Sequence, residues 1–258
     1  MRLPSAVVAI SVVASVLATA CATSPLGRRQ LMLVSQSQVT EMGVASYREM
    51  QTKLPATKDA RTSAYVNCVA RQITAEVGGS QAWEVTVFES KDINAFALPG
   101  GKIGVYTGLL KAATNQDQLG AVIGHEIAHV LANHSAERLS DSMAAGLGAQ
   151  VAGIATGVDP QLFEMAGNVF FVLPFSRAHE SEADLLGLDL MAKAGFDPRQ
   201  SIPLWQNMAR LGGNKPAEFM STHPSDETRI RHLSERLNVS MPLYEQAQAS
   251  GKRPQCAR

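Results

Sequence analysis

The segment His125-Glu126-Ile127-Ala128-His129 constrains the fold of this chain more than any other feature. A helix turns about 100° per residue, so His125 and His129 would lie on one face, one turn apart, and could bind one metal ion. Zinc in hydrolases keeps three protein ligands and one open position, and it lowers the pKa of its water to about 7. Glu126, at the edge of the same face, is suited to be the general base. The segment predicts a hydrolytic zinc site on a helix.

The non-functional alternative is an amphipathic helix that carries two incidental histidines. The flanking residues 119–124 and 130–132 are apolar, so the helix is expected to be buried. Buried histidines need polar partners, and a metal ion supplies one. We therefore favour the metal site over the incidental pair.

A second acidic segment follows about fifty residues later. Glu180 and Asp184 are four residues apart and share a helix face, whereas Glu182 does not. Ala183 and Leu185 give this helix an apolar side to pack against the histidine helix. One of the two acids on the shared face is the expected third metal ligand.

The pattern along the chain predicts an α+β fold, mostly helical, with a small β-sheet before the histidine helix. Strands are expected at 83–88, 95–98 and 102–106, the last two joined by the turn Pro99-Gly100-Gly101. Helices are expected at 36–54, 58–77, from 115 through the histidines, and at 176–194, 201–211 and 225–237. Residues 143–175 read as two short helices and a loop, either a mobile lid or plain packing against the histidine helix.

Four blocks of sequence together resemble one family. These are His125-Glu126-x-x-His129, Ser176-Arg177-x-x-Glu180-x-Glu182-Ala183-Asp184, the strand segment 94–101, and Thr222-His223-Pro224-Ser225 with Arg229. They are similar to the zinc endopeptidases that include the HtpX heat-shock protease and the CAAX prenyl protease, above all the short bacterial lipoprotein members of the BepA and LoiP kind. The resemblance covers residues 60 to 238 and implies a gluzincin-like zincin domain with one zinc ion per chain.

The resemblance also implies roles for single residues. Glu180 would be the third zinc ligand, and Asp184 would accept the N–H of a zinc-binding histidine and so fix its tautomer. Arg177 matches an arginine of the family, and either a structural ion pair or a substrate contact would explain it. Asn94, Ala95 and Phe96 would bind an extended peptide by strand addition.

The remaining histidines have different expected roles. His223 is our candidate oxyanion donor, because Pro224 restricts its backbone to an extended conformation. A self-inhibited state with His223 as fourth zinc ligand, or a purely structural role, stays open. His134 lies nine residues after His125 and is expected to point away from the metal, and His179 is also expected to lie outside the ligand set.

Residues 1–20 are predicted to be an export signal. Residues 6–20 form an apolar run with small residues directly before Cys21, and the run is too short for the roughly 20 residues of a membrane-spanning helix. Cys21 resembles the lipidated cysteine of bacterial lipoproteins, although Ala18 stands where leucine is usual, so an ordinary signal peptide cut nearby is the alternative. Ala22, rather than aspartate, implies the outer membrane, with the protein anchored on its periplasmic face.

These features predict four segments: a lipoprotein signal peptide at 1–20, a tether at 21–35, the metallopeptidase domain at 36–240 and a C-terminal tail at 241–258. Without Cys21, Cys68 and Cys256 are the remaining cysteines. In an oxidising compartment such a pair is usually a disulfide. A buried free Cys68 and a frayed tail are the alternative.

The formal net charge is +0, and no basic cluster occurs, so nucleic acid is not an expected partner. We expect a lipid-anchored endopeptidase that hydrolyses misfolded or damaged envelope proteins, with unfolded or misassembled proteins as substrates. The alternative is an envelope chaperone or scaffold whose zinc site is latent or structural.

Overall fold

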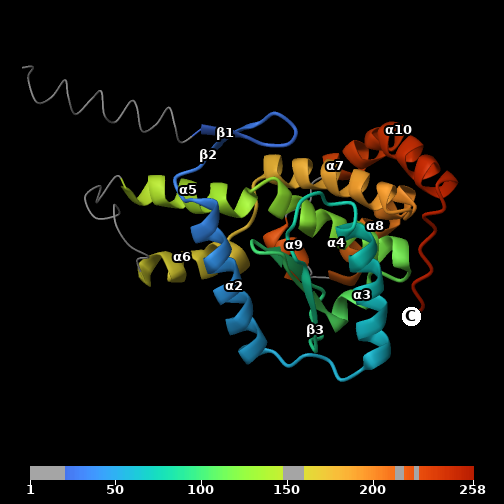
Figure 1. Ribbon diagram of the computed structural model, residues 1–258, viewed down its shortest axis with the longest axis horizontal. Coiled ribbons are helices and arrows are strands. Elements are labelled where there is room, and N and C mark those ends of the chain that lie inside the picture. Colours follow the sequence, from blue (N-terminus) through green and yellow to red (C-terminus); the bar gives the residue numbers. More distant parts are fainter. Residues whose placement is uncertain (1–20, 148–159, 213–217, 224–226) are drawn as a thin grey trace, which may run out of the picture.

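The computed structural model describes residues 21–147, 160–212, 218–223 and 227–258. The fold is mostly helical, as expected, with two small sheets (Figure 1). The strands are β1 (Cys21–Thr23), β2 (Arg29–Leu31), β3 (Glu84–Phe88), β4 (Ala95–Leu98) and β5 (Lys102–Tyr106). The α-helices are α2 (Gln36–Lys53), α3 (Ala60–Thr74), α4 (Gln116–Leu131), α5 (His134–Leu147), α6 (Pro160–Phe171), α7 (Arg177–Lys193), α8 (Ser201–Gly212), α9 (Glu218–Thr222) and α10 (Glu227–Ala249). Two 3-10 turns, η1 (Thr107–Lys111) and η2 (Pro198–Gln200), connect them.

The central sheet contains the three strands that the sequence predicts, in the order β3-β5-β4. β5 pairs with β3 in parallel and with β4 in antiparallel fashion, which leaves β4 at an edge. The tight β4–β5 turn requires the left-handed backbone of Gly100 and Gly101, whose φ angles are +88° and +71°. This geometry places the edge strand next to α4.

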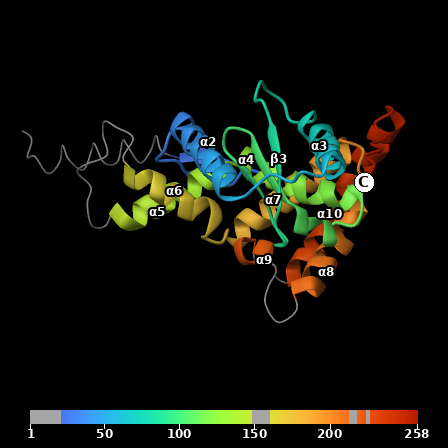
Figure 2. The same ribbon diagram turned by 90° about the horizontal axis from the view of Figure 1, so that it is seen from below.

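The two faces of this sheet bury different hydrophobic clusters, because alternate side chains of a strand point to opposite faces. One face, with Val87, Ile103 and Val105, packs against α3, α4, α7 and α8. The other face, with Phe88, Phe96 and Tyr106, packs against α2, α5 and α6. Figure 2 shows the sheet between α2 on one side and α3 on the other.

Helices α4 and α7, which carry the metal-binding motifs, cross with their backbones in close contact. Two glycines make it possible. A Cβ atom on Gly124 would lie 2.8 Å from the carbonyl oxygen of Gly187, and one on Gly187 would lie 2.7 Å from the backbone nitrogen of His125. Without side chains at these two positions, the backbones of the helices lie in contact and bring their polar residues together.

Residues 21–35 differ from the tether that the sequence predicts. β1 and β2 form an antiparallel hairpin that pairs Cys21 with Leu31, and the hairpin lies against α5 and α7 (Figure 1). Its buried Gln30 donates from Nε2 to the carbonyl of Ala132 at 2.6 Å. Arg28 and Gln30 of this segment thus form hydrogen bonds to the body of the protein.

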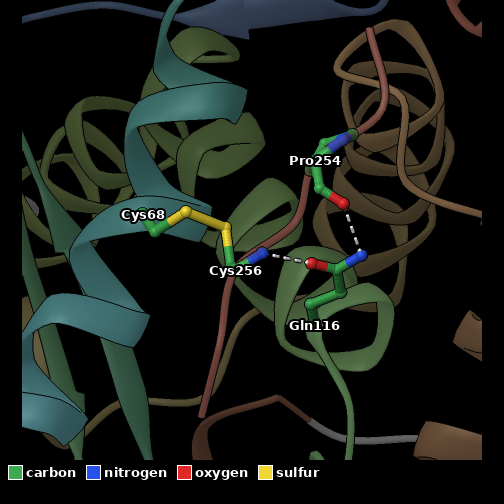
Figure 3. Close-up of a disulfide and its surroundings, with 4 residues drawn as sticks. All are labelled: Cys68, Gln116, Pro254 and Cys256. Atoms are coloured by element: carbon green, nitrogen blue, oxygen red, sulfur yellow. Dashed lines mark hydrogen bonds between the residues drawn. A yellow bond between two sulfur atoms is a disulfide. The ribbon is translucent and has the colours of Figure 1, made fainter.

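The C-terminal end is also more ordered than a free tail. The helix expected at 225–237 continues as α10 to Ala249, with Pro242 inside it. Cys256 forms a disulfide with Cys68 of α3, with a Cα–Cα distance of 5.7 Å (Figure 3). Gln116, the first residue of α4, accepts from the backbone N–H of Cys256 and donates to the carbonyl of Pro254, each at 2.8 Å. The tail is thereby fixed to both α3 and α4.

Three sequence expectations fall outside the described residues: the signal peptide at 1–20, the middle of the segment 143–175, and the start of the helix at Ser225. In the part of the chain that the structure describes, no helix combines the length and the apolar character needed to span a membrane.

Candidate metal centre

Four buried side chains form a cluster that could hold one metal ion. They are His125 and His129 of α4, Glu180 of α7, and His223 directly after α9, and one ligand atom from each lies within 4.8 Å of the others. The Nε2 atoms of His125 and His129 are 3.0 Å apart. Nδ1 of His223 lies 2.9 Å from Oε1 of Glu180. The helical spacing of the first two residues and the α4–α7 crossing bring this donor set together.

The tautomer of His125 is fixed by Asp184. Oδ1 of Asp184 lies 2.9 Å from Nδ1 of His125, so it accepts that N–H and leaves the lone pair of Nε2 directed into the cluster. The carboxylates also favour positive charge at this point. Although burial opposes the shift, Asp184 and Glu180 raise the pKa of His125 to about 9. Asp184 therefore has the position that the expected role requires.

The tautomer of His129 is fixed through a second histidine. Nδ1 of His129 lies 2.9 Å from Nδ1 of His134, whose Nε2 lies 3.1 Å from Oε2 of Glu182. Burial, together with the nearby His179, lowers the pKa of His134 to about 4, which keeps its ring neutral. The carboxylate of Glu182 accepts a hydrogen bond from Nε2–H of His134, so Nδ1 of His134 accepts one from Nδ1–H of His129. The lone pair of Nε2 of His129 then also faces the cluster.

These two arrangements show that the donor set fits a zinc ion. Nε2 of His125 and Nε2 of His129 face each other across 3.0 Å, a position in which a proton or a metal ion can lie between the two nitrogens. A site of histidine nitrogens and a carboxylate oxygen matches the donors that Zn²⁺ prefers. His125, His129 and Glu180 would hold the ion, with His223 in reach as a fourth donor.

His134 corrects one expectation from the sequence. As expected, His134 is not a member of the four-residue cluster. Contrary to expectation, its side chain points toward the cluster. α4 ends at Leu131, and Asn133 adopts a left-handed backbone with φ of 56°. His134 begins a new helix, so an extrapolation of helical register from His125 fails, and its ring contacts His129 instead. His179 stacks on His134 with ring centroids 4.5 Å apart and lies outside the cluster, as expected.

Glu126 lies beside the cluster with a free oxygen. It is buried, and its Oε1 has no hydrogen-bond partner among the described residues. This atom is 3.6 Å from Nε2 of His223. Burial raises the pKa of the Glu126 carboxyl, whereas the neighbouring histidines and the backbone N–H of Ala97 lower it. A buried carboxylate oxygen directed at a metal cluster is available to accept a proton.

The cleft next to Glu126 is formed by the edge strand. Its volume is about 210 Å³, and its lining includes Asn94, Ala95 and Phe96 together with Glu126 and His223. Its other lining residues are mostly aromatic or apolar: Met50, Ala97, Leu98, Tyr106, Phe170, Phe171 and Phe175, with Ser135 and Thr222. The strand segment expected to bind substrate thus borders the candidate general base.

Arg229 is a site residue to which the sequence analysis assigned no role. Its guanidinium is buried, 2.6 Å from Oδ1 of Asp184 and 3.2 Å from Oε2 of Glu180. The same group lies over the ring of Trp205 at 3.4 Å. The position of Arg229 within the His-Pro block was the signal by which the sequence could have identified it.

The charge of Glu180 is stabilised by its neighbours. Although burial opposes the shift, His223 and His125 hold the pKa of Glu180 well below its usual value. Arg177 is exposed and lines a separate cleft beside Glu180 and Asp184.

Comparison with known proteins identifies the family. Residues 57–237 match the model of peptidase family M48, whose members are zinc-dependent metallopeptidases. The chain belongs to this family.

Several relatives can be named. The chain is 38% identical over 218 residues to the mitochondrial metalloendopeptidase OMA1 of Schizosaccharomyces pombe, covering 81% of this chain and 64% of the relative. It is 33% identical over 245 residues to the human mitochondrial metalloendopeptidase OMA1, covering 86% and 47%. It is 26% identical over 258 residues to the beta-barrel assembly-enhancing protease of Escherichia coli K12, covering 94% and 53%. The chain spans about half the length of the curated relatives it matches.

The resemblance inferred from the four sequence blocks is confirmed at the level of the family. The likeness to the BepA kind is supported in part, because the E. coli relative is that protease. The OMA1 relatives were not expected from the sequence.

Proposed function

We propose that this protein is a zinc-dependent endopeptidase in which Glu126 acts as the general base. The observation that carries the proposal is the position of the buried carboxylate. It lies between a cluster of zinc donors and a cleft bordered by an edge strand. His125, His129 and Glu180 would hold the ion. Family membership supports the same reaction class.

The proposed mechanism assigns a task to each side of the cleft. β4 binds an extended peptide as an added strand, so recognition rests on backbone hydrogen bonds and suits unfolded chains. Zinc supplies a Lewis acid that polarises the scissile carbonyl and acidifies water. Glu126 takes a proton from the attacking water and passes it to the departing amine. Asp184 and Arg229 hold His125 and Glu180 in place through the contacts described above.

His223 has two proposed states. In the described conformation its Nδ1 lies 3.3 Å from Nε2 of His125, where it would occupy the fourth position at the metal. This geometry favours the self-inhibited arrangement over the oxyanion donor that we preferred from the sequence. A swing of His223 away from the cluster would open the position that water needs and place the imidazole beside the substrate.

The proposed substrates are misfolded or misassembled proteins of a bacterial cell envelope. The relative from E. coli is a beta-barrel assembly-enhancing protease, whereas the OMA1 relatives are named as mitochondrial. The disulfide and the lipobox-like Cys21 favour an exported protein, anchored by lipid to the periplasmic face of the outer membrane. Mass spectrometry of the mature N-terminus tests this: an unmodified residue there excludes the anchor.

A chaperone or scaffold with a latent zinc site is the second candidate. The unpartnered oxygen of Glu126 speaks against it, because a purely structural site has no use for a buried free acceptor.

Glu126→Gln separates the two candidates. The amide keeps the shape of the side chain but cannot take a proton, so we expect unchanged zinc content and a loss of casein hydrolysis of about 10²–10⁴-fold. Zinc is measured by elemental analysis and hydrolysis by fluorescence release from labelled casein. Full activity in the variant, or a wild-type protein without zinc, would exclude the proposed mechanism.

A further inference from the structure

A buried network of charged residues lies outside the metal cluster and plays no part in the proposed mechanism. It contains Glu137 of α5, Glu182 of α7 and Arg28 of the N-terminal hairpin, together with His134 and His179. Burying so many ionisable groups is costly unless each is paired. The network lies between the hairpin and His129, so it can support the orientation of that metal ligand.

The two histidines of α4 are supported in different ways. His125 donates directly to a carboxylate, Asp184. His129 has no carboxylate at its outer nitrogen, Nδ1; the ring of His134 lies there, at 2.9 Å. A histidine can accept this hydrogen bond only if its own proton is on the other nitrogen. The orientation of His129 therefore depends on the group that accepts the hydrogen bond from Nε2–H of His134, which is Glu182.

Glu182 is in turn held by the hairpin. The backbone N–H of Leu26 donates to its Oε1 at 3.3 Å, and Nε of Arg28 donates to its Oε2 at 3.1 Å. The other guanidinium nitrogens of Arg28 form hydrogen bonds to both carboxylate oxygens of Glu137, and Gln30 adds a further one at 2.8 Å. Arg28 thus fixes two acids of different helices at once. Oε2 of Glu182 is shared, because Nε of Arg28 and Nε2 of His134 both lie 3.1 Å from it.

We propose that His134 and Glu182 are positioning residues for the metal ligand His129, and that the N-terminal hairpin, through Arg28, holds Glu182 in place for this role. The chain of contacts runs from Arg28 to Glu182, to His134 and to Nδ1 of His129. It keeps the metal-binding nitrogen of His129 unprotonated and directed at Glu180. The segment that follows the predicted anchor at Cys21 is therefore part of the metal site's support. This inference rests on the zinc site of the proposed function.

The test measures zinc affinity rather than peptidase activity. The dissociation constant is determined for the purified protein by competition with a fluorescent chelator. Loss of a partner behind a zinc-binding histidine typically costs 10–100-fold in metal affinity. We expect that cost for His134→Leu, which cannot accept from His129. We expect near wild-type affinity for His134→Asn, whose amide oxygen can take the place of Nδ1.

Glu182→Met removes both acceptor oxygens at a similar side-chain length. The Nε2–H of His134 then has no acceptor, so we expect at least a 10-fold loss of affinity. Glu182→Gln, whose single oxygen can still accept from both Arg28 and His134, should lose less. For the hairpin, Arg28→Ala should weaken zinc binding, whereas the adjacent, exposed Arg29→Ala should not. Thermal unfolding of the metal-free variants shows whether each remains folded. If Glu182→Met does not, the comparison of His134→Leu with His134→Asn decides.

The outcomes separate the two proposals. Wild-type protein that does not bind zinc would remove the proposed function itself. Wild-type protein that binds zinc, with wild-type affinity in both His134→Leu and Glu182→Met, would overturn the positioning role. Equal losses in His134→Asn and His134→Leu would also contradict it, because a residue that only fills space gains nothing from an acceptor. Unchanged affinity in Arg28→Ala would overturn the role of the hairpin.

Discussion

At the scale of single residues, His223 decides whether the metal cluster is open to a substrate. It lies at the end of a short helix, its ring stacks on Phe219 with centroids 4.3 Å apart, and its Nδ1 points at Glu180 and His125. A fourth protein ligand leaves no position for water, and catalytic zinc sites keep such a position open. With a zinc ion bound in the described conformation, the proposed function would therefore have a closed site.

We expect His223→Ala to weaken zinc binding severalfold and to raise casein hydrolysis, because it removes the closing ligand. His232→Ala, a histidine of α10 outside the cluster, is the matched control and should change neither quantity. The opposite result, retained zinc with kcat lowered by about 10²–10³ and little change in KM, would show that His223 stabilises the transition state instead.

Which site residues the sequence predicts depends on how far apart they lie along the chain. His125, Glu126 and His129 follow from local helical geometry. The same rule places Glu180 and Asp184 on one face of a second helix, and the family resemblance implies their separate roles. The contacts of Arg229 with both acids depend on how α10 packs against α7, which no local pattern encodes. His134 was misjudged for a local reason, since the left-handed Asn133 interrupts the helix whose register was assumed to continue.

At the scale of secondary-structure elements, the crossing of α4 and α7 sets the distance between the histidines and Glu180. Because a Cβ on Gly187 would lie 2.7 Å from the nitrogen of His125, a side chain there must push the helices apart. The strands and most helices were predictable because their period-2 and period-3.6 patterns are local. The hairpin at 21–31 was not, because its polar residues satisfy partners that only the folded chain provides.

Gly187→Ala is expected to lower the stability of the protein by about 1–3 kcal/mol, because it overpacks this crossing. Zinc affinity should fall as well, since the clash moves His125 away from Glu180. Gly167→Ala in α6 is the control: its Cβ would meet nothing within 4 Å, so the substitution should be neutral or stabilising by roughly 0.5–1 kcal/mol. Unfolding in urea and chelator competition measure the two effects. Equal stability of the two variants would show that the crossing tolerates a wider separation.

At the scale of the whole molecule, the Cys68–Cys256 disulfide connects parts of the chain that are 188 residues apart. It fixes the C-terminal segment across α3 and the first turn of α4, where Gln116 holds Pro254 and Cys256 (Figure 3). The tail, α10 and α7 also pack together, and Gln248 donates to the carbonyl of Gly195 at 2.9 Å. The cross-link therefore supports the first turn of α4, the helix that carries His125 and His129, as well as the C-terminal segment.

We expect the double variant Cys68→Ser, Cys256→Ser to be less stable than the wild type by about 2–5 kcal/mol. The chain-entropy model gives a value near the upper end of that range for so long a loop, because the cross-link restricts the unfolded chain. Urea unfolding measures the difference. Dithiothreitol should destabilise the wild type by a similar amount and leave the double variant unchanged, which separates the cross-link from an effect of the serines. Zinc affinity should change little, since the cluster lies on α4, α7 and His223, away from the tail. Two free thiols in the non-reduced, denatured protein, or equal unfolding free energies for the two proteins, would show that the bond does not contribute as argued.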